Sequence, residues 1–178
     1  MTSQRESEIE TLAINTLQEV GETQFPIDVM QVANAVGIAI YDAHFQNSSI
    51  TGAIQKSVDG GKIWVNQFDS PIRQRFAIAH EIGHWLLHMH AGDAWSEPRN
   101  LIDVEMLEWQ PHTNWNGSEQ EREANQFAAA LLMPLPWLDT IRLARPSWNN
   151  ASLASFCGAS LLAMEMRTHR MERTELYE

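Results

Sequence analysis

Hydrophobic residues recur at three- and four-residue spacing in two early segments of the chain, 7–20 and 26–37, which predicts two amphipathic helices. A glycine follows or closes each segment, as is typical of helix ends. Three short apolar runs then predict the strands of a small sheet, at 38–41, 50–54 and 62–65. The turn Asp59-Gly60-Gly61 predicts that the second and third strands form a hairpin.

The second half of the chain is predicted to be mainly helical. Asp69-Ser70-Pro71 combines an N-cap residue with a proline suited to the first helical position, so a helix should run to about His90. Residues 91–117 resemble an irregular connection, 118–133 a clear helix ended by prolines, and 135–172 two or three shorter helices. The pattern predicts an α+β fold, with a main domain over 1–140 and a helical C-terminal extension over 141–178 that packs on it.

Composition narrows the class of protein. The chain has 178 residues, of which 44% are hydrophobic, and its net charge is −11. Such a chain can bury a core, whereas its negative charge makes direct nucleic-acid binding an unfavoured role. No apolar run approaches the roughly 20 residues of a membrane span, and the N-terminus lacks a signal-peptide stretch. With Cys157 as the single cysteine, these features predict a cytoplasmic protein without a membrane partner or a disulfide.

The stretch His80-Glu81-Ile82-Gly83-His84 carries the most specific chemistry. On a helix, His80 and His84 lie one turn apart on the same face, so both imidazoles can bind one metal ion. Glu81 lies about a hundred degrees round the helix, where it can take a proton from water beside the metal. This is the arrangement of zinc hydrolases. Burial of two histidines and a glutamate without partners would be costly, which favours a metal site over a structural role.

A catalytic zinc usually has a third protein ligand. His90 has the spacing of a metzincin ligand, but Leu87 occupies the position of the required glycine, so we expect the helix to turn His90 away. His88 lies one further turn beyond His84, too far along the axis to share the ion. We expect His88 beside the site or in its cleft.

The next helix offers two more candidates for the third ligand. Glu121 and Asn125 share a face, so Glu121 can bind the metal while Asn125 hydrogen-bonds one of its ligands. Alternatively, Ser118-x-x-Glu121 forms a capping box, and Glu123 is the ligand. The spacing alone leaves both alternatives open.

Several segments, taken in order, resemble the ImmA/IrrE family of metallo-endopeptidases. They are Pro26 to Ile38, Thr51-Gly52-Ala53-Ile54, Ile63-Trp64-Val65-Asn66, Arg75 to His84 with His88, and Glu121 to Pro134. The resemblance covers about residues 8–140. It implies a zincin-like domain in which a sheet of about three strands packs on the HExxH helix and on a second ligand helix.

The resemblance also implies a gluzincin-like site with one zinc per chain, or manganese in its place in the cell. His80, His84 and Glu121 are the implied ligands, and Asn125 takes the position of the family's asparagine. Glu81 is the implied general base, which takes a proton from metal-bound water and passes it to the leaving amine. We expect one further residue to donate a hydrogen bond to the oxyanion that forms during hydrolysis. The candidates are His88, His112 and Tyr41.

The implied substrate is a specific protein, since family members often cleave a helix-turn-helix repressor or antitoxin and so switch on genes of a mobile element, a phage or a stress response. Thr51, Gly52 and Ala53 lie on a strand to which an extended peptide can add by backbone pairing. The alternative hypothesis is a non-catalytic regulatory protein, for instance of a toxin–antitoxin or phage system, that keeps the fold and acts by binding.

The tail and the tryptophans add weaker expectations. Residues 150–167 resemble a helix-turn-helix, but residues 135–178 hold five arginines and five acidic residues, so packing on the main domain is the favoured role. Cys157 is predicted to be a small core residue. The tryptophans in predicted elements are expected in the core, and the others in or beside irregular segments. The first set is Trp64, Trp85 and Trp137, and the second is Trp95, Trp109, Trp115 and Trp148.

Overall fold

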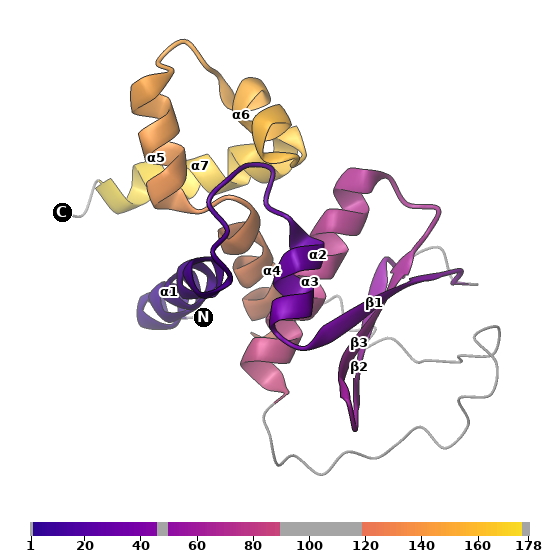
Figure 1. Cartoon of the computed structure of the whole chain (residues 1–178). Helices are drawn as coiled ribbons and strands as arrows, with labels where there is room; N and C mark the ends of the chain where they lie inside the picture. Colours follow the sequence, from indigo (N-terminus) through magenta and orange to yellow (C-terminus); the bar gives the residue numbers. More distant parts are fainter. Residues whose placement is uncertain (1, 46–49, 90–118, 176–178) are drawn as a thin grey trace.

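A computed structural model describes residues 2–45, 50–89 and 119–175 of the chain. Helices α3 and α4 lie in the middle, with the sheet on one side and helices α5 to α7 on the other (Figure 1). Helix α3 contacts strands β2 and β3, so the HExxH helix covers the sheet. The α+β prediction is confirmed. In chain order the elements are α1 Ser3–Val20, α2 Val29–Ala35, β1 Ile38–Ala43, β2 Gly52–Ser57, β3 Gly60–Asn66, α3 Pro71–His88, α4 Glu119–Leu132, α5 Leu135–Ala144, α6 Asn150–Cys157 and α7 Leu161–Glu175.

Strand β3 is the central strand of the described sheet, in the order β1-β3-β2. Strands β2 and β3 form the predicted antiparallel hairpin, and β1 runs parallel to β3. The strand predicted at 50–54 begins later, at Gly52, and runs on through polar Gln55 and Lys56, because pairing with β3 uses only their backbone groups. Thr51 still pairs through its carbonyl, which accepts a hydrogen bond from the N–H of Asn66 at 3.0 Å. Strand β2 is an edge of the described sheet.

Capping residues explain where the helices begin. The Thr2 hydroxyl accepts a hydrogen bond from the N–H of Arg5, so α1 starts four residues before the prediction. Asp28 caps α2, which therefore begins at Val29 and not at the predicted proline. The predicted start of α3 is confirmed: the Ser70 hydroxyl caps it, and proline follows at the first position. Helix α3 ends two residues before the predicted His90.

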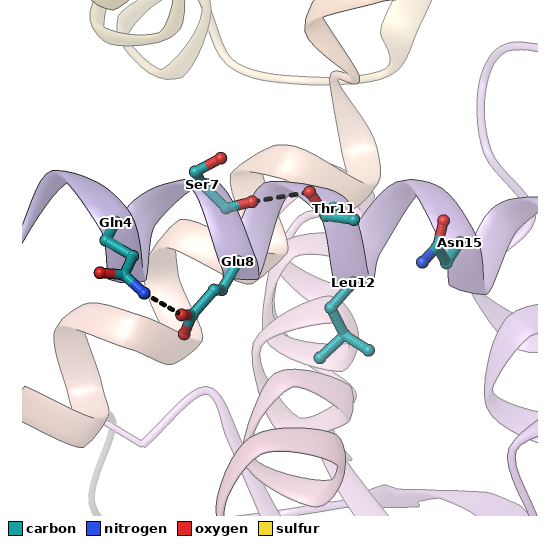
Figure 2. Close-up of a pocket in the computed structure, with 6 residues that line it drawn as sticks. All are labelled: Gln4, Ser7, Glu8, Thr11, Leu12 and Asn15. Carbon is teal, nitrogen blue, oxygen red and sulfur yellow. Dashed lines mark hydrogen bonds between the residues drawn. The ribbon is translucent and has the colours of Figure 1, made fainter.

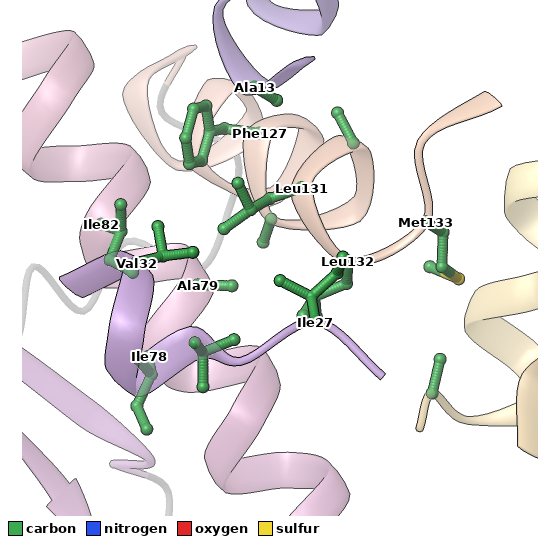
Figure 3. Close-up of a cluster of buried hydrophobic side chains, with 14 of the residues drawn as sticks. Ala13, Ile27, Val32, Ile78, Ala79, Ile82, Phe127, Leu131, Leu132 and Met133 are labelled. Carbon is green, nitrogen blue, oxygen red and sulfur yellow. The ribbon is translucent and has the colours of Figure 1, made fainter. Parts of the chain in front are cut away.

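The core fills the space between helices α1 to α4 and the inner face of the sheet. Side chains of α1, α2, α3 and α4 gather around Phe127 and Leu131, which are fully buried (Figure 3). Fully burying side chains of this size contributes about 1.5–3 kcal/mol each. Helices α3 and α4 share this core, so the two predicted ligand helices are held together by packing and do not depend on a metal for their contact.

Gly83 allows α3 and α4 to approach each other closely. A Cβ atom at this position would lie 3.2 Å from the Cα and the carbonyl oxygen of Ala124, and 3.2 Å from the Cβ of Phe127. Two of these atoms are backbone, so a side chain at residue 83 would push the helices apart. The glycine inside the HExxH motif therefore fixes the distance between the two helices that carry the site.

Helices α5, α6 and α7 form the C-terminal segment. Gly158, Ala159 and Ser160 connect α6 to α7 in the segment where the sequence resembles a helix-turn-helix. Arg167 on α7 is 2% exposed; its guanidinium pairs with Glu10 of α1 and donates to the carbonyl of Met133. The C-terminal segment is thus bonded to α1 and to the end of α4. The division of the chain at residue 140 stays a prediction.

The tryptophans differ from one another in their surroundings. Trp85 packs against the core and donates its Nε1–H to the carbonyl of Val36, and Trp137 also packs against the core. The prediction that Trp64 is a core residue is wrong, because strand alternation turns its buried neighbours Ile63 and Val65 toward α3 and Trp64 outward. Trp148 is partly buried, and Cys157 is fully buried, as predicted. Trp95, Trp109 and Trp115 lie outside the described residues.

Among the residues that the structure describes, one stretch, Glu119–Ala144, is long and apolar enough to cross a membrane by length and composition, with a mean hydropathy of 1.3 over an 18-residue window. The stretch does not begin with a run of consecutive apolar residues, because charged and amide residues occupy its first turns. In the structure the stretch comprises two helices, α4 and α5, and α4 contributes Phe127 and Leu131 to the core. In the fold, 44% of its apolar window is buried.

Candidate metal centre

Helices α3 and α4 bring two histidines and a carboxylate to one point. The Nε2 atoms of His80 and His84 lie 3.0 Å apart. From the first turn of α4, Glu121 places one oxygen 3.2 Å from Nε2 of His80 and the other 3.3 Å from Nε2 of His84. All three side chains are largely buried, and their ligand atoms converge on a space of the size of a metal ion.

The spacing of these atoms fits zinc. Zinc binds nitrogen and oxygen ligands at about 2.0–2.2 Å, so two ligands of one tetrahedral zinc lie about 3.3 Å apart. The observed separations are 3.0, 3.2 and 3.3 Å. Two imidazoles with one carboxylate are also a frequent donor set of catalytic zinc sites. The residues present therefore fit the metal that the sequence predicts.

Asn125 orients the first histidine. It lies one turn after Glu121 on α4, and its Oδ1 is 3.1 Å from Nδ1 of His80. An amide oxygen is an acceptor, so this contact places the imidazole proton on Nδ1 and leaves the Nε2 lone pair for a metal. Asn125 thus takes the place that the sequence analysis gave it, beside a ligand.

His88 lies beside His84 but does not join the metal cluster. Its Nδ1 is 3.1 Å from Nδ1 of His84, on the side of the ring away from the metal, and its Nε2 is 3.1 Å from Glu123. Glu123 in turn accepts two hydrogen bonds from Arg5 of α1. Of the two carboxylates left open as the third ligand, the structure places Glu121 at the two histidines and Glu123 against Arg5.

Hydrogen bonds and burial set the charges of the cluster. Burial lowers the pKa of His80, but the hydrogen bond with Glu121 and the nearby carboxylates outweigh it, and the net shift is upward. Hydrogen bonds from His80 and His84 hold the pKa of Glu121 well below its usual range. Glu121 is therefore ionised at neutral pH, and a metal that replaces the shared protons would release them to solvent.

Glu81 lies between the metal cluster and the sheet. It is 8% exposed, and burial raises its pKa, while the charges of His80 and His84 lower it. Gly52 at the start of β2 faces this residue: a Cβ added there would lie 3.5 Å from Oε1 of Glu81. Glu81 thus lies between the two histidines and an edge strand of the sheet.

The remaining predicted residues are placed as follows. Gly52 and Ala53 are the first residues of β2, and Thr51 precedes them. Tyr41 stacks on Trp64, with ring centroids 6.1 Å apart, on the sheet face opposite to α3, so the structure does not bring it to the metal cluster. His112 and His90 lie outside the described residues.

A separate hollow of about 570 Å³ lies on the outer side of α1 and contains none of the cluster residues (Figure 2). Five of its six lining side chains are exposed, and two contacts within the helix, Gln4 to Glu8 and Thr11 to the carbonyl of Ser7, already use several of its polar groups. It is an open surface, not a catalytic cleft. The lining residues are Gln4, Ser7, Glu8, Thr11, Leu12 and Asn15.

A family model described as the IrrE N-terminal-like domain, Peptidase_M78, matches residues 33–169. The chain belongs to this metallopeptidase family. The match starts within α2 and runs into α7, so it begins later and ends later than the predicted 8–140. Helix α1, with Arg5, precedes the part of the chain that the Peptidase_M78 model matches.

A solved structure of a Mycobacterium tuberculosis transcriptional regulator has a similar fold, with a TM-score of 0.59 at 17% sequence identity. The match covers 89% of this chain and 45% of that one, so the chain spans less than half the length of the regulator. At this identity the likeness shows a shared fold alone. No curated protein matches the chain.

Sequence reasoning missed Arg5 altogether. The one local signal was its position: Arg5 follows the capping residue Thr2 and so lies in the first turn of α1. Nothing in the local sequence shows that this turn packs beside Glu123.

Proposed function

We propose that this member of the Peptidase_M78 family is a zinc-dependent endopeptidase that cleaves a specific protein, with Glu81 as general base. The observation that carries the proposal is the cluster of His80, His84 and Glu121, whose ligand atoms lie 3.0–3.3 Å apart with buried Glu81 beside them. The family supports zinc as the metal.

We assign a separate role in peptide hydrolysis to each of these residues. His80, His84 and Glu121 would hold zinc, which polarises the scissile carbonyl and makes water easier to deprotonate. Glu81 takes the proton of the attacking water, because its burial favours the protonated carboxyl that results. Glu81 then passes the proton to the leaving amine. Asn125 keeps the proton of His80 on Nδ1 throughout.

The edge strand β2 supports a peptide substrate in extended form. Its first residue, Gly52, lies against Glu81, and no described strand pairs with its outer edge. An extended peptide that added to this edge would pass the base with its backbone. The proposed substrate is a helix-turn-helix repressor or antitoxin. A net charge of −11 favours association with such a basic, DNA-binding protein.

The first test joins metal content to cleavage. Elemental mass spectrometry of protein purified without a His-tag or chelator should find about one zinc per chain. The protein is then incubated with an extract of cells that produce it, and new N-termini are identified by amine labelling. Glu81→Gln, which keeps the ligand set, is the matched control and should retain zinc but produce no new N-termini.

The outcomes separate the alternatives. New N-termini confined to one or a few helix-turn-helix proteins, and dependent on Glu81, support the proposal. If Glu81→Gln keeps the regulatory effect of the protein in cells, the chain acts by binding and the peptidase proposal is wrong. A protein that takes up no zinc, even after zinc is added and dialysed away, is not a zinc peptidase.

A further inference from the structure

A second histidine–carboxylate group lies next to the metal cluster, and metal binding does not explain it. Nδ1 of His88 is 3.1 Å from Nδ1 of His84, and Nε2 of His88 is 3.1 Å from Oε2 of Glu123. Arg5 donates from Nε and Nη2 to the two oxygens of Glu123, at 2.7 and 2.8 Å. These contacts form an unbroken chain from α1 to His84.

The direction of each hydrogen bond follows from the atom that must be free. Nε2 of His84 faces His80 and Glu121, so the proton of a metal-binding His84 lies on Nδ1. That N–H donates to Nδ1 of His88, which must then be unprotonated. His88 therefore carries its own proton on Nε2 and donates it to Glu123. One assignment satisfies every member of the chain.

Burial and charge stabilise this series of hydrogen bonds from Arg5 to His84. The side chains of His88 and Glu123 are 11% and 9% exposed, so water competes little for their hydrogen bonds. The Arg5 guanidinium meets Glu123 as a two-pronged fork, the strongest geometry for such a pair. Glu123 accepts from Arg5 at both oxygens and from Nε2 of His88 at Oε2, so its carboxylate is held in place as the acceptor for His88.

We propose that Arg5, Glu123 and His88 are positioning residues that hold the ring of His84 in the orientation and tautomer needed to bind metal. The proposal rests on the metal site proposed above. It makes α1, which precedes the matched residues 33–169, a working part of the metal centre. Asn125 orients His80 by a direct contact, and His88, Glu123 and Arg5 together orient His84 in the same way.

The competing explanation is that Arg5 merely docks α1. The structure provides a control for this, because α1 has a second buried attachment: Glu10 pairs with Arg167 and accepts a hydrogen bond from Gln126 of α4. Glu10→Gln weakens docking of α1 and leaves the hydrogen bonds among Arg5, Glu123, His88 and His84 unchanged. Glu8→Gln removes the other ion pair of Arg5, which is exposed.

The experiment measures the zinc dissociation constant of the full chain by competition with a chromophoric chelator. His88→Leu should weaken zinc binding about 10- to 100-fold, as is typical when a partner of a ligand is lost. His88→Asn offers an amide oxygen to His84 and should recover part of the affinity. Arg5→Met and Glu123→Gln should weaken binding in the same direction, while Glu8→Gln and Glu10→Gln keep wild-type affinity. The cobalt(II)-loaded His88→Leu protein should show an altered visible absorption spectrum.

Each result decides something. Wild-type zinc affinity in His88→Leu, Glu123→Gln and Arg5→Met overturns the positioning role, and the metal centre stands if Glu121→Ala still loses zinc. Equal weakening by Glu10→Gln assigns the effect to docking of α1 and also overturns the role. A wild-type protein without zinc rejects the metal centre itself. If thermal unfolding of the metal-free protein shows that His88→Leu is unfolded, Arg5→Met decides, because its side chain is 36% exposed and its loss creates no cavity.

Discussion

Two histidine–carboxylate groups lie one helical turn apart between α3 and α4, and they differ in what the carboxylate meets. Glu121 meets the Nε2 atoms of His80 and His84, whereas Glu123 meets His88 on one side and Arg5 on the other. The ligand atoms of the first group, on His80, His84 and Glu121, converge on one point. In the second group, both ring nitrogens of His88 and both oxygens of Glu123 are already engaged in hydrogen bonds. Histidine and glutamate thus form a candidate metal site in one place and, with Arg5 added, a hydrogen-bonded network in the other.

The difference teaches that local spacing does not decide which glutamate can bind a metal. Both glutamates lie on the same helix, two positions apart. Arg5, 118 positions away in sequence from Glu123, decides it by occupying that carboxylate.

The largest expected effect separates the two carboxylates. Glu121→Ala should lower zinc content from about one per chain to near zero after dialysis, because two imidazoles alone hold zinc weakly. Glu123→Ala should keep zinc at the same stoichiometry, with the weaker affinity proposed above. Elemental mass spectrometry of both proteins checks this, and zinc loss from Glu123→Ala alone would reverse the assignment.

Gly83→Ala tests whether the spacing of the helices serves both groups. The added methyl would meet the backbone of Ala124 at 3.2 Å, so we expect a loss of about 1–3 kcal/mol in the free energy of unfolding. Zinc affinity should fall as well, because the ligands on α3 and α4 move apart. Gly52→Ala is the matched control: it crowds Ala77 and Glu81, so it should lower cleavage and leave zinc affinity unchanged. Unchanged zinc affinity in Gly83→Ala would mean that the helices tolerate a wider spacing.

Arg5→Met tests the second group through stability. It leaves Glu123 buried with His88 as its remaining partner among the described residues, which should cost about 1–2 kcal/mol in the metal-free protein once the partial exposure of Arg5 is allowed for. Glu8→Gln, which removes an exposed pair on the same helix, should change the free energy of unfolding by less than about 0.5 kcal/mol. Urea unfolding of both variants measures this. Equal effects would show that burial of Glu123 is irrelevant.

Cys157 shows what burial does to a titratable group when no partner keeps it charged. Burial raises the pKa of its thiol to about 12, although the charge of Arg75 acts to lower it. The folded protein thus holds this proton above the unfolded pKa of 9.0, and stability falls as pH rises from 9 toward 12. We expect a loss of about 1 kcal/mol between pH 9 and pH 10 that is missing in Cys157→Ala. Urea unfolding at the two pH values, under reducing conditions, tests the sign.

Much of this architecture could be predicted because its determinants are local. The pattern around Pro71, the glycine turn before β3 and the HExxH spacing each depend on neighbours within a few residues, and the structure has the predicted helix, hairpin and histidine pair. The face of a helix follows directly from its period, so His80 and His84 could be paired from sequence alone.

The errors came from features that neighbours do not decide. Trp64 is as apolar as a core residue, but strand register turns it outward. Strand β2 extends into polar residues because its partner supplies the hydrogen bonds. The role of Glu123 depends on where α1 docks, and docking is a property of the whole fold.

Arg167 has a consequence for the outer surface of the molecule. Its guanidinium is engaged with Glu10 and Met133 inside the protein, so it is withdrawn from solvent. The exposed apolar residues in the first turns of α7 are Leu161, Leu162 and Met166. A partner that bound through these turns would bury apolar side chains and would form few ion pairs. The affinity of such a complex would therefore depend little on salt concentration. Its formation would show a negative heat-capacity change, which calorimetry measures.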